Sequence, residues 1–89
     1  MRVREFNGEI RAGNVLLIDC PAVMKGERHC DGKVRIPFDP PLPGFSANDA
    51  ERKWLRDSGE SVDTITLSPS IDAGNCGHFF VRNGEIILV

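Results

Sequence analysis

The chain has no long apolar run and no apolar segment behind its N-terminus. Its longest apolar stretches, 15–18 and 86–89, are the length of single strands, whereas a membrane-spanning helix needs about 18 or more such residues. The first residues include basic side chains but lack the apolar core of a signal peptide. These absences predict a cytoplasmic protein with no membrane contact.

Clustered positive charge is also missing. The 11 Lys and Arg residues are outnumbered by 13 Asp and Glu residues, which gives a net charge of −2. The densest basic cluster, Arg52-Lys53 with Arg56, has Glu51 and Asp57 as acidic neighbours. Because nucleic-acid binding needs a concentrated basic surface, the composition argues against nucleic acid and favours another protein as the partner.

Cysteine is scarce and odd in number. A secreted disulfide scaffold normally carries an even set, whereas this chain has three cysteines and two histidines. With 89 residues it forms a single domain, 1–89, whose hydrophobic core is marginal. Chains of this size often gain stability from a disulfide or a metal ion.

Turn residues and alternating apolar positions predict a mainly β domain of the α+β class, built on a small antiparallel sheet. The Ser68-Pro69-Ser70 segment is expected to end or bend one strand. The predicted strands are 3–6 and 9–11, joined by an Asn7-Gly8 turn, then 15–20, 33–38 and 62–67.

The clearest local signal is a C-terminal β-hairpin over 78–89. An Asn83-Gly84 turn favours a two-residue hairpin connection. It would place Arg82 opposite Glu85, Val81 opposite Ile86 and Phe79 opposite Leu88. These pairs match opposite charges and apolar side chains, so the predicted register is strongly specified.

One helix is predicted over 46–57. Ser46 with Asp49 resembles an N-terminal capping box. Ala47, Ala50 and Trp54 would form one apolar stripe. Gly59 stands where a helix commonly ends.

Cysteine and histidine positions predict a structural zinc site. Zinc takes four thiolate or imidazole ligands in tetrahedral geometry, and Cys20, Cys30, Cys76 and His78 supply such a set. Cys20 ends a predicted strand, and Cys30 lies at the far end of the loop that follows. Cys76 and His78 share one face if the last hairpin extends back to residue 76. His29 is an alternative to Cys30 or Cys76.

Other interpretations of these residues stay open. Cys20 could be a small buried apolar residue or form a disulfide with Cys30, although a cytosolic setting disfavours a disulfide. Cys76 with His78, or Cys30 with His29, could form a nucleophile and base. Residues two apart on a strand seldom face each other in this way, so the metal interpretation is preferred.

Several segments resemble a family of small, mostly phage and prophage proteins of unknown function, some of which carry the label "ammonia monooxygenase". The resemblance covers 13–89 and rests on an early Cys-Pro, a Trp, a Thr-x-x-Pro-Ser-Ile segment and a His-x-Phe hairpin. Here these are Cys20-Pro21, Trp54, Thr66-Leu-Ser-Pro-Ser-Ile71 and His78-Phe-Phe80. The resemblance implies a zinc-ribbon-like β domain in a bacterial host cell, with Cys20 and His78 at the matching positions.

The sequence therefore favours a phage-type accessory protein that acts as a structural zinc-binding interaction module, with no catalytic residues assigned. The Pro-rich segment 39–45 and the predicted helix 46–57 would present the partner-binding surface. The alternatives are a metal-free β-rich phage structural protein and a small metal-dependent enzyme, which would need an open coordination position on the zinc.

Overall fold

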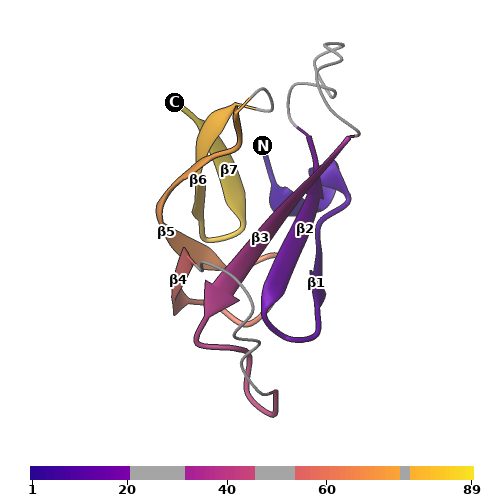
Figure 1. The fold of residues 1–89 in the computed structure, drawn as a ribbon, viewed down its shortest axis with the longest axis vertical. Coiled ribbons are helices and arrows are strands. Elements are labelled where there is room, and N and C mark those ends of the chain that lie inside the picture. Colours follow the sequence, from indigo (N-terminus) through magenta and orange to yellow (C-terminus); the bar gives the residue numbers. More distant parts are fainter. Residues whose placement is uncertain (21–31, 46–53, 75–76) are drawn as a thin grey trace.

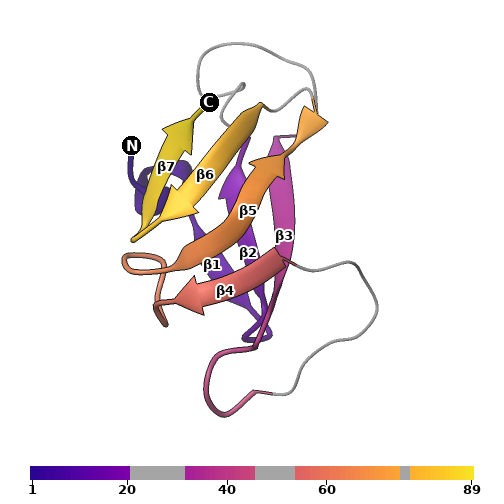
Figure 2. The same ribbon diagram turned by 90° about the vertical axis from the view of Figure 1, so that its left-hand side faces the viewer.

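The computed structural model describes residues 1–20, 32–45, 54–74 and 77–89. Within these residues a short 3-10 helix, η1 (Val3–Phe6), precedes seven strands that form one curled sheet in sequential order. The strands are β1 (Glu9–Arg11), β2 (Val15–Asp19), β3 (Lys33–Asp39), β4 (Trp54–Ser58), β5 (Thr66–Asp72), β6 (His78–Arg82) and β7 (Glu85–Leu88). Figures 1 and 2 show β1–β3 lying across from β6 and β7. The predicted mainly β class is confirmed.

The sheet is mixed rather than purely antiparallel. β3 and β4 run parallel and pair through Phe38 with Trp54 and Asp39 with Leu55. The other neighbouring strands in the described residues pair antiparallel. A parallel pair needs a long connection between its strands, and here the chain from 40 to 53 makes it.

The hydrophobic core fills the space inside the curled sheet. Side chains alternate between the two faces of a strand, so every second residue of β2, β3 and β6 enters the core. The fully or almost fully buried side chains of this core are Val3, Phe6, Leu16, Ile18, Cys20, Val34, Ile36, Phe38, Ile65, Leu67, Ile71, Phe79, Val81 and Ile86. The predicted strands at 15–20 and 33–38 are confirmed by β2 and β3.

The first three residues lie along the outer edge of β7 (Figures 1 and 2). Arg2 forms an antiparallel bridge with Glu85. The Val3 amide donates to the Gly84 carbonyl at 2.8 Å, and the Ile86 amide donates to the Met1 carbonyl at 2.6 Å. These bonds cover an edge that would otherwise expose unpaired backbone groups.

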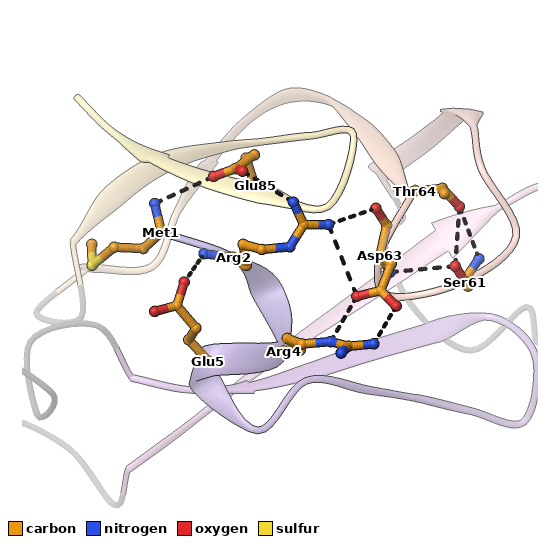
Figure 3. Close-up of polar contacts among 8 residues, drawn as sticks. All are labelled: Met1, Arg2, Arg4, Glu5, Ser61, Asp63, Thr64 and Glu85. Atoms are coloured by element: carbon orange, nitrogen blue, oxygen red, sulfur yellow. Dashed lines mark hydrogen bonds and ion pairs between the residues drawn. The ribbon is translucent and has the colours of Figure 1, made fainter.

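Charged side chains reinforce this contact (Figure 3). Arg2 donates to the Glu85 carboxylate at 3.3 Å and to the Asp63 carbonyl at 3.1 Å. Arg4 donates through Nε to the Asp63 carboxylate at 2.9 Å. The N-terminal ammonium of Met1 also lies 3.3 Å from Glu85. Each exposed ion pair contributes little alone, but together they position the N-terminus between β7 and the 61–64 turn.

The predicted hairpin over 3–11 is wrong. Residues Val3–Phe6 form η1, and Asn7 ends that helix with a φ of 54°. Three-residue spacing places Val3 and Phe6 on the same side of a 3-10 turn, and both are buried. The Arg2 amide donates to the Glu5 carboxylate at 2.6 Å, which supports the first turn. β1 pairs with β2 instead.

The predicted helix over 46–57 is wrong at its C-terminal end, where residues 54–57 belong to β4. Trp54 donates through Nε1 to the Ser70 carbonyl at 3.3 Å, and Leu55 pairs with Ser68 of β5. Long-range pairing therefore overrides the helical periodicity of this segment. The remainder of the predicted helix, 46–53, lies outside the described residues.

The predicted strand 62–67 is correct only at its end, because residues 61–64 form a turn and β5 begins at Thr66. The Thr64 and Ile65 amides both donate to the Ser61 carbonyl, which closes that turn. Ser68-Pro69-Ser70 does not end the strand. It instead shifts the β5–β6 register between Leu67 and Ile71.

The C-terminal hairpin is confirmed in register. Arg82 pairs with Glu85, Val81 with Ile86 and Phe79 with Leu88. The zinc-ribbon-like arrangement is not confirmed, because the segments that carry Cys30 and Cys76 lie outside the described residues. In the part of the chain that the structure describes, no helix has the length and apolar character needed to cross a bilayer.

Candidate functional site

Cys20 directly follows β2 and is completely buried. Its amide donates to the Gly32 carbonyl at 2.8 Å, which joins the end of β2 to the residue that precedes β3. The Cys20 sulfur is disulfide-bonded, and its partner lies outside the described residues. Cys30, Cys76 and His29 all fall in segments that are not described, so the structure leaves their predicted roles untested.

The disulfide brings a second sulfur within bonding distance of Cys20 Sγ. A disulfide sulfur is not a zinc ligand, because zinc binds the thiolate. Reduction would release two closely spaced thiols. Two thiolates on one tetrahedral zinc ion lie about 3.8 Å apart, as follows from Zn–S bonds of about 2.3 Å. The zinc ligation of Cys20 stays a prediction, because its sulfur partner lies outside the described residues.

His78 is the first residue of β6, and its side chain is exposed. Its Nε2 lies 2.7 Å from Ser70 Oγ on the neighbouring strand β5. His78 is directly opposite Asp72 in the β5–β6 register, and Ser70 shares a strand face with Asp72. Ser70 and His78 are therefore diagonal neighbours, a separation that side chains can span.

Three contacts hold Ser70 in place. Its carbonyl accepts from Trp54 Nε1 at 3.3 Å, the following Ile71 is buried in the core, and Ile71 pairs with Phe79 of β6. The contact between Ser70 and His78 is thus built by β4, β5 and β6 together. From the sequence, Ser70 is expected only to be part of a strand-ending bend, because no local signal indicates its partner on another strand.

The described candidate ligands lie at one end of the molecule but on different faces. The end of β2 and the start of β6 are near each other in both views (Figures 1 and 2). Cys20 belongs to the core, whereas alternation along β6 buries Phe79 and exposes His78. Among the described residues, no three His, Cys, Asp or Glu side chains form a group that could hold a metal ion.

The outer face of β4–β6 also carries a groove of about 280 Å³. The guanidinium of Arg82 lies 4.3 Å from the centre of the Phe80 ring on this face, a favourable cation–π contact. The alternation of His78, Phe80 and Arg82 along β6 would have identified one side of the groove. The groove is lined by Asp57, Thr66, Leu67, Ser68, Pro69, Ser70, Phe80 and Arg82.

Comparison of the chain with family models, curated proteins and solved structures finds no significant match. The resemblance to the phage and prophage family therefore stays a prediction. The structure adds one observation on its quoted residues: Trp54, Ser70, Ile71 and His78 lie together on three adjacent strands.

Proposed function

We propose that this chain is a phage-type accessory protein that acts as a small interaction module, cross-linked at one end through Cys20. In a reducing compartment the cross-link would be a structural zinc ion held by Cys20, Cys30, Cys76 and His78. The observation that carries the proposal is the buried Cys20 at a strand end, with a second sulfur at bonding distance.

Zinc is favoured over a permanent disulfide by the expected cytoplasmic location, where thiols are kept reduced. Reduction without metal would leave two thiols with no cross-link between them. Zinc binding would restore the cross-link and contribute directly to folding stability, because the unfolded chain holds no preformed site. The ion would act structurally, with all four positions taken by protein ligands.

The proposal is tested by measuring the zinc content of protein purified in reducing buffer without added metal. About one zinc per chain is expected, together with a lower melting temperature after treatment with a chelator. Cys20→Ser should abolish zinc binding. Val81→Ala is the matched control, because it also truncates a fully buried side chain but should keep the zinc.

Less than about half an equivalent of zinc, with melting under reducing conditions unaffected by the chelator, would contradict the zinc site. That result would leave the metal-free β-rich accessory protein as the better account. Equal zinc content in Cys20→Ser and the unmodified protein would also contradict the assignment of Cys20.

The interaction role is supported by the Pro-rich segment that follows β3. Arg56 donates to the carbonyls of Pro40 and Pro41, both at 3.0 Å, and the Leu42 amide donates to the Gly13 carbonyl at 2.8 Å. The segment ends at Phe45, whose side chain is 54% exposed. A surface segment that is already ordered loses little entropy when it binds a partner.

This part of the proposal can be tested by site-specific photo-crosslinking in cells. A photoreactive phenylalanine analogue at position 45 should form one discrete adduct with another protein. The same analogue at Ile87, which is 44% exposed on β7, is the control and should form none. Equal labelling from both positions, or none from position 45, would contradict a binding role for the Pro-rich segment.

A further inference from the structure

We infer that the outer face of β4–β6 binds a second copy of this chain through two rows of side chains, one charged and one apolar. Figure 2 shows these three strands side by side in front of β1–β3, and they are neighbours in the sheet order. The inference goes beyond the proposed function, because it depends neither on zinc nor on the Pro-rich segment.

The charged row consists of Asp57 on β4, Thr66 on β5 and Arg82 on β6. Leu67 pairs with Val81. The next residues along the two antiparallel strands, Thr66 and Arg82, therefore lie beside each other. Asp57 lies where the β4–β5 register shifts. All three members of the row line the groove, which places them on the outer face of the sheet.

The apolar row lies next to the charged one. Leu55 of β4 pairs with Ser68 of β5, and Phe80 of β6 lies opposite the irregular segment 68–70. Leu55 is a large apolar side chain that is nevertheless 53% exposed, and Phe80 is half-buried. Each row therefore has a short side chain on β5 between longer ones on β4 and β6, and this difference in length helps to form the groove.

Arg82 is available for a contact outside the chain. The register pairs it with Glu85, but the Glu85 carboxylate is occupied by Arg2 and by the Met1 ammonium, both at 3.3 Å. The Arg82 guanidinium instead lies over the Phe80 ring. Within the part of the chain that the structure describes, its N–H groups have no hydrogen-bond or ion-pair partner.

Asp57 carries the opposite charge on the other side of the groove. Its carboxylate likewise forms no hydrogen bond or ion pair with the residues that the structure describes. Adjacent strands lie about 4.8 Å apart. The backbones at Asp57 and Arg82 are separated by β5, so they lie about 10 Å apart. The two charges therefore stand at opposite ends of one row.

A row with opposite charges at its two ends is complementary to itself. A two-fold axis that runs parallel to β5, between two facing sheets, would exchange the positions of β4 and β6. It would place Arg82 against Asp57 of the second copy, and Phe80 against Leu55 of the second copy. Each contact would occur twice in the dimer. An axis at right angles to β5 would instead place Arg82 against itself, and like charges repel.

The dimensions agree with this arrangement. Facing sheets pack about 10 Å apart, a gap that the long side chain of Arg82 and the shorter one of Asp57 can close together. Because the sheet curls around its core, contact is limited to β4–β6. Such a narrow interface should bury less than the roughly 1,200 Å² at which stable complexes begin, so the dimer is expected to be weak and in rapid exchange.

The same pattern disfavours other occupants of this face. A polyanion such as nucleic acid would meet Asp57 beside Arg82 on a chain whose net charge is −2. The groove, at about 280 Å³, is smaller than the usual small-molecule site of about 300–1,000 Å³. A second copy supplies both charges that the row lacks.

Sedimentation equilibrium of the full chain at neutral pH and low salt measures the association directly. A reversible dimer is expected at protein concentrations up to about 1 mM. Arg82→Glu would oppose two carboxylates and should weaken dimerisation about 10-fold or more. Asp57→Arg should have a similar effect by opposing two arginines. The variant with both substitutions restores opposite charges and should recover most of the affinity.

Two further variants complete the series. Leu55→Ser should also weaken dimerisation, with little effect on folding because Leu55 is exposed. Arg11→Glu is the matched control, because its side chain is 67% exposed on β1 at the far edge of the sheet, and it should leave the association unchanged. Thermal melting of each variant verifies that the fold is kept. A dimer that is insensitive to both charge reversals, or not restored by combining them, would overturn the inference.

Amide NMR spectra of the unmodified protein at increasing concentration provide a test that needs no variant. Concentration-dependent shifts should be confined to β4–β6 and be largest near Thr66 and Phe80. Shifts confined to β1 and β2, or no shifts and a monomeric protein up to about 1 mM, would overturn the inference. None of these results depends on zinc, so failure here would leave the proposed function unaffected.

Discussion

Replacing Arg56 with alanine should destabilise the protein more than replacing the exposed Arg82. The Arg56 guanidinium donates to three backbone carbonyls, those of Pro40 at 3.0 Å, Pro41 at 3.0 Å and Gly59 at 2.9 Å. The planar fork of an arginine suits this arrangement, because it directs several N–H groups at fixed angles. The side chain thereby connects β4 to the segment that leaves β3.

The magnitude follows from the two bonds that are partly buried, to Pro41 and Gly59. A hydrogen bond to a charged group contributes about 1.5–3 kcal/mol, and the exposed bond to Pro40 adds less because water replaces it. The free energy of unfolding should therefore fall by about 2–4 kcal/mol. For a domain of this size, that corresponds to a melting temperature lower by about 10–30 °C.

The assay is urea unfolding at neutral pH, with Arg82→Ala as the matched control. Arg82 is exposed, and its guanidinium lies over Phe80, a contact that contributes about 0.5–1 kcal/mol at exposed sites. Arg56→Lys should give an intermediate loss, because an ammonium group cannot reach three separate carbonyls. Amide exchange at Leu42 should also accelerate in Arg56→Ala. A loss no larger than that of Arg82→Ala would refute the reasoning.

Three further changes are expected to alter stability. Gly84→Ala should lower the free energy of unfolding by more than about 2 kcal/mol, because φ at Gly84 is +74° and an added Cβ would lie 2.3 Å from the Asp63 carbonyl oxygen. Gly74→Ala should lower the free energy of unfolding less, because φ there is +60° and no atom lies near the added Cβ. Equal decreases in melting temperature for the two variants would contradict this expectation. Asn14→Leu should raise the free energy of unfolding by about 1–2 kcal/mol, because neither polar atom of the buried side-chain amide has a hydrogen-bond partner in the described structure. A decrease in the free energy of unfolding would contradict this reasoning. The hydrogen bond from Lys33 lowers the pKa of Asp19 from its ordinary 3.8. The ionised Asp19 therefore stabilises the fold above pH 3.8, and this stabilisation is lost as the pH falls through the lowered pKa. Asp19→Asn should therefore flatten the acid side of the stability profile, and an unchanged profile would contradict this role.

The parts of the fold that were predicted correctly are those with short-range causes. The Asn83-Gly84 turn and the opposite charges of Arg82 and Glu85 lie within a few residues of each other, so they specify the last hairpin without help from the remainder of the chain. The alternation in 33–38 is equally local. It identifies the buried face of β3 whatever the strand pairs with.

The incorrect predictions share a different cause. The Trp54 segment has a helical pattern of apolar residues, but Trp54 bonds to Ser70 and Leu55 pairs with Ser68. Val3 and Phe6 are compatible with a strand, but both side chains reach the core only from a 3-10 turn. In each case the deciding partner is distant in sequence, and a local pattern carries no information about it.

The candidate site likewise combines residues that local chemistry predicts with contacts that depend on distant parts of the chain. Residue chemistry predicts Cys20 and His78 as zinc ligands, because thiolate and imidazole are the ligands that zinc prefers, and these assignments stay predictions. The amino-acid sequence also determined the last hairpin and the strands at 9–11, 15–20 and 33–38, through turn residues and alternation. Only the tertiary structure decided that β3 and β4 run parallel, that residues 1–3 cover the edge of β7, and that Ser70 meets His78. These features depend on contacts between distant segments, and such contacts form only when the whole sheet is assembled around its core.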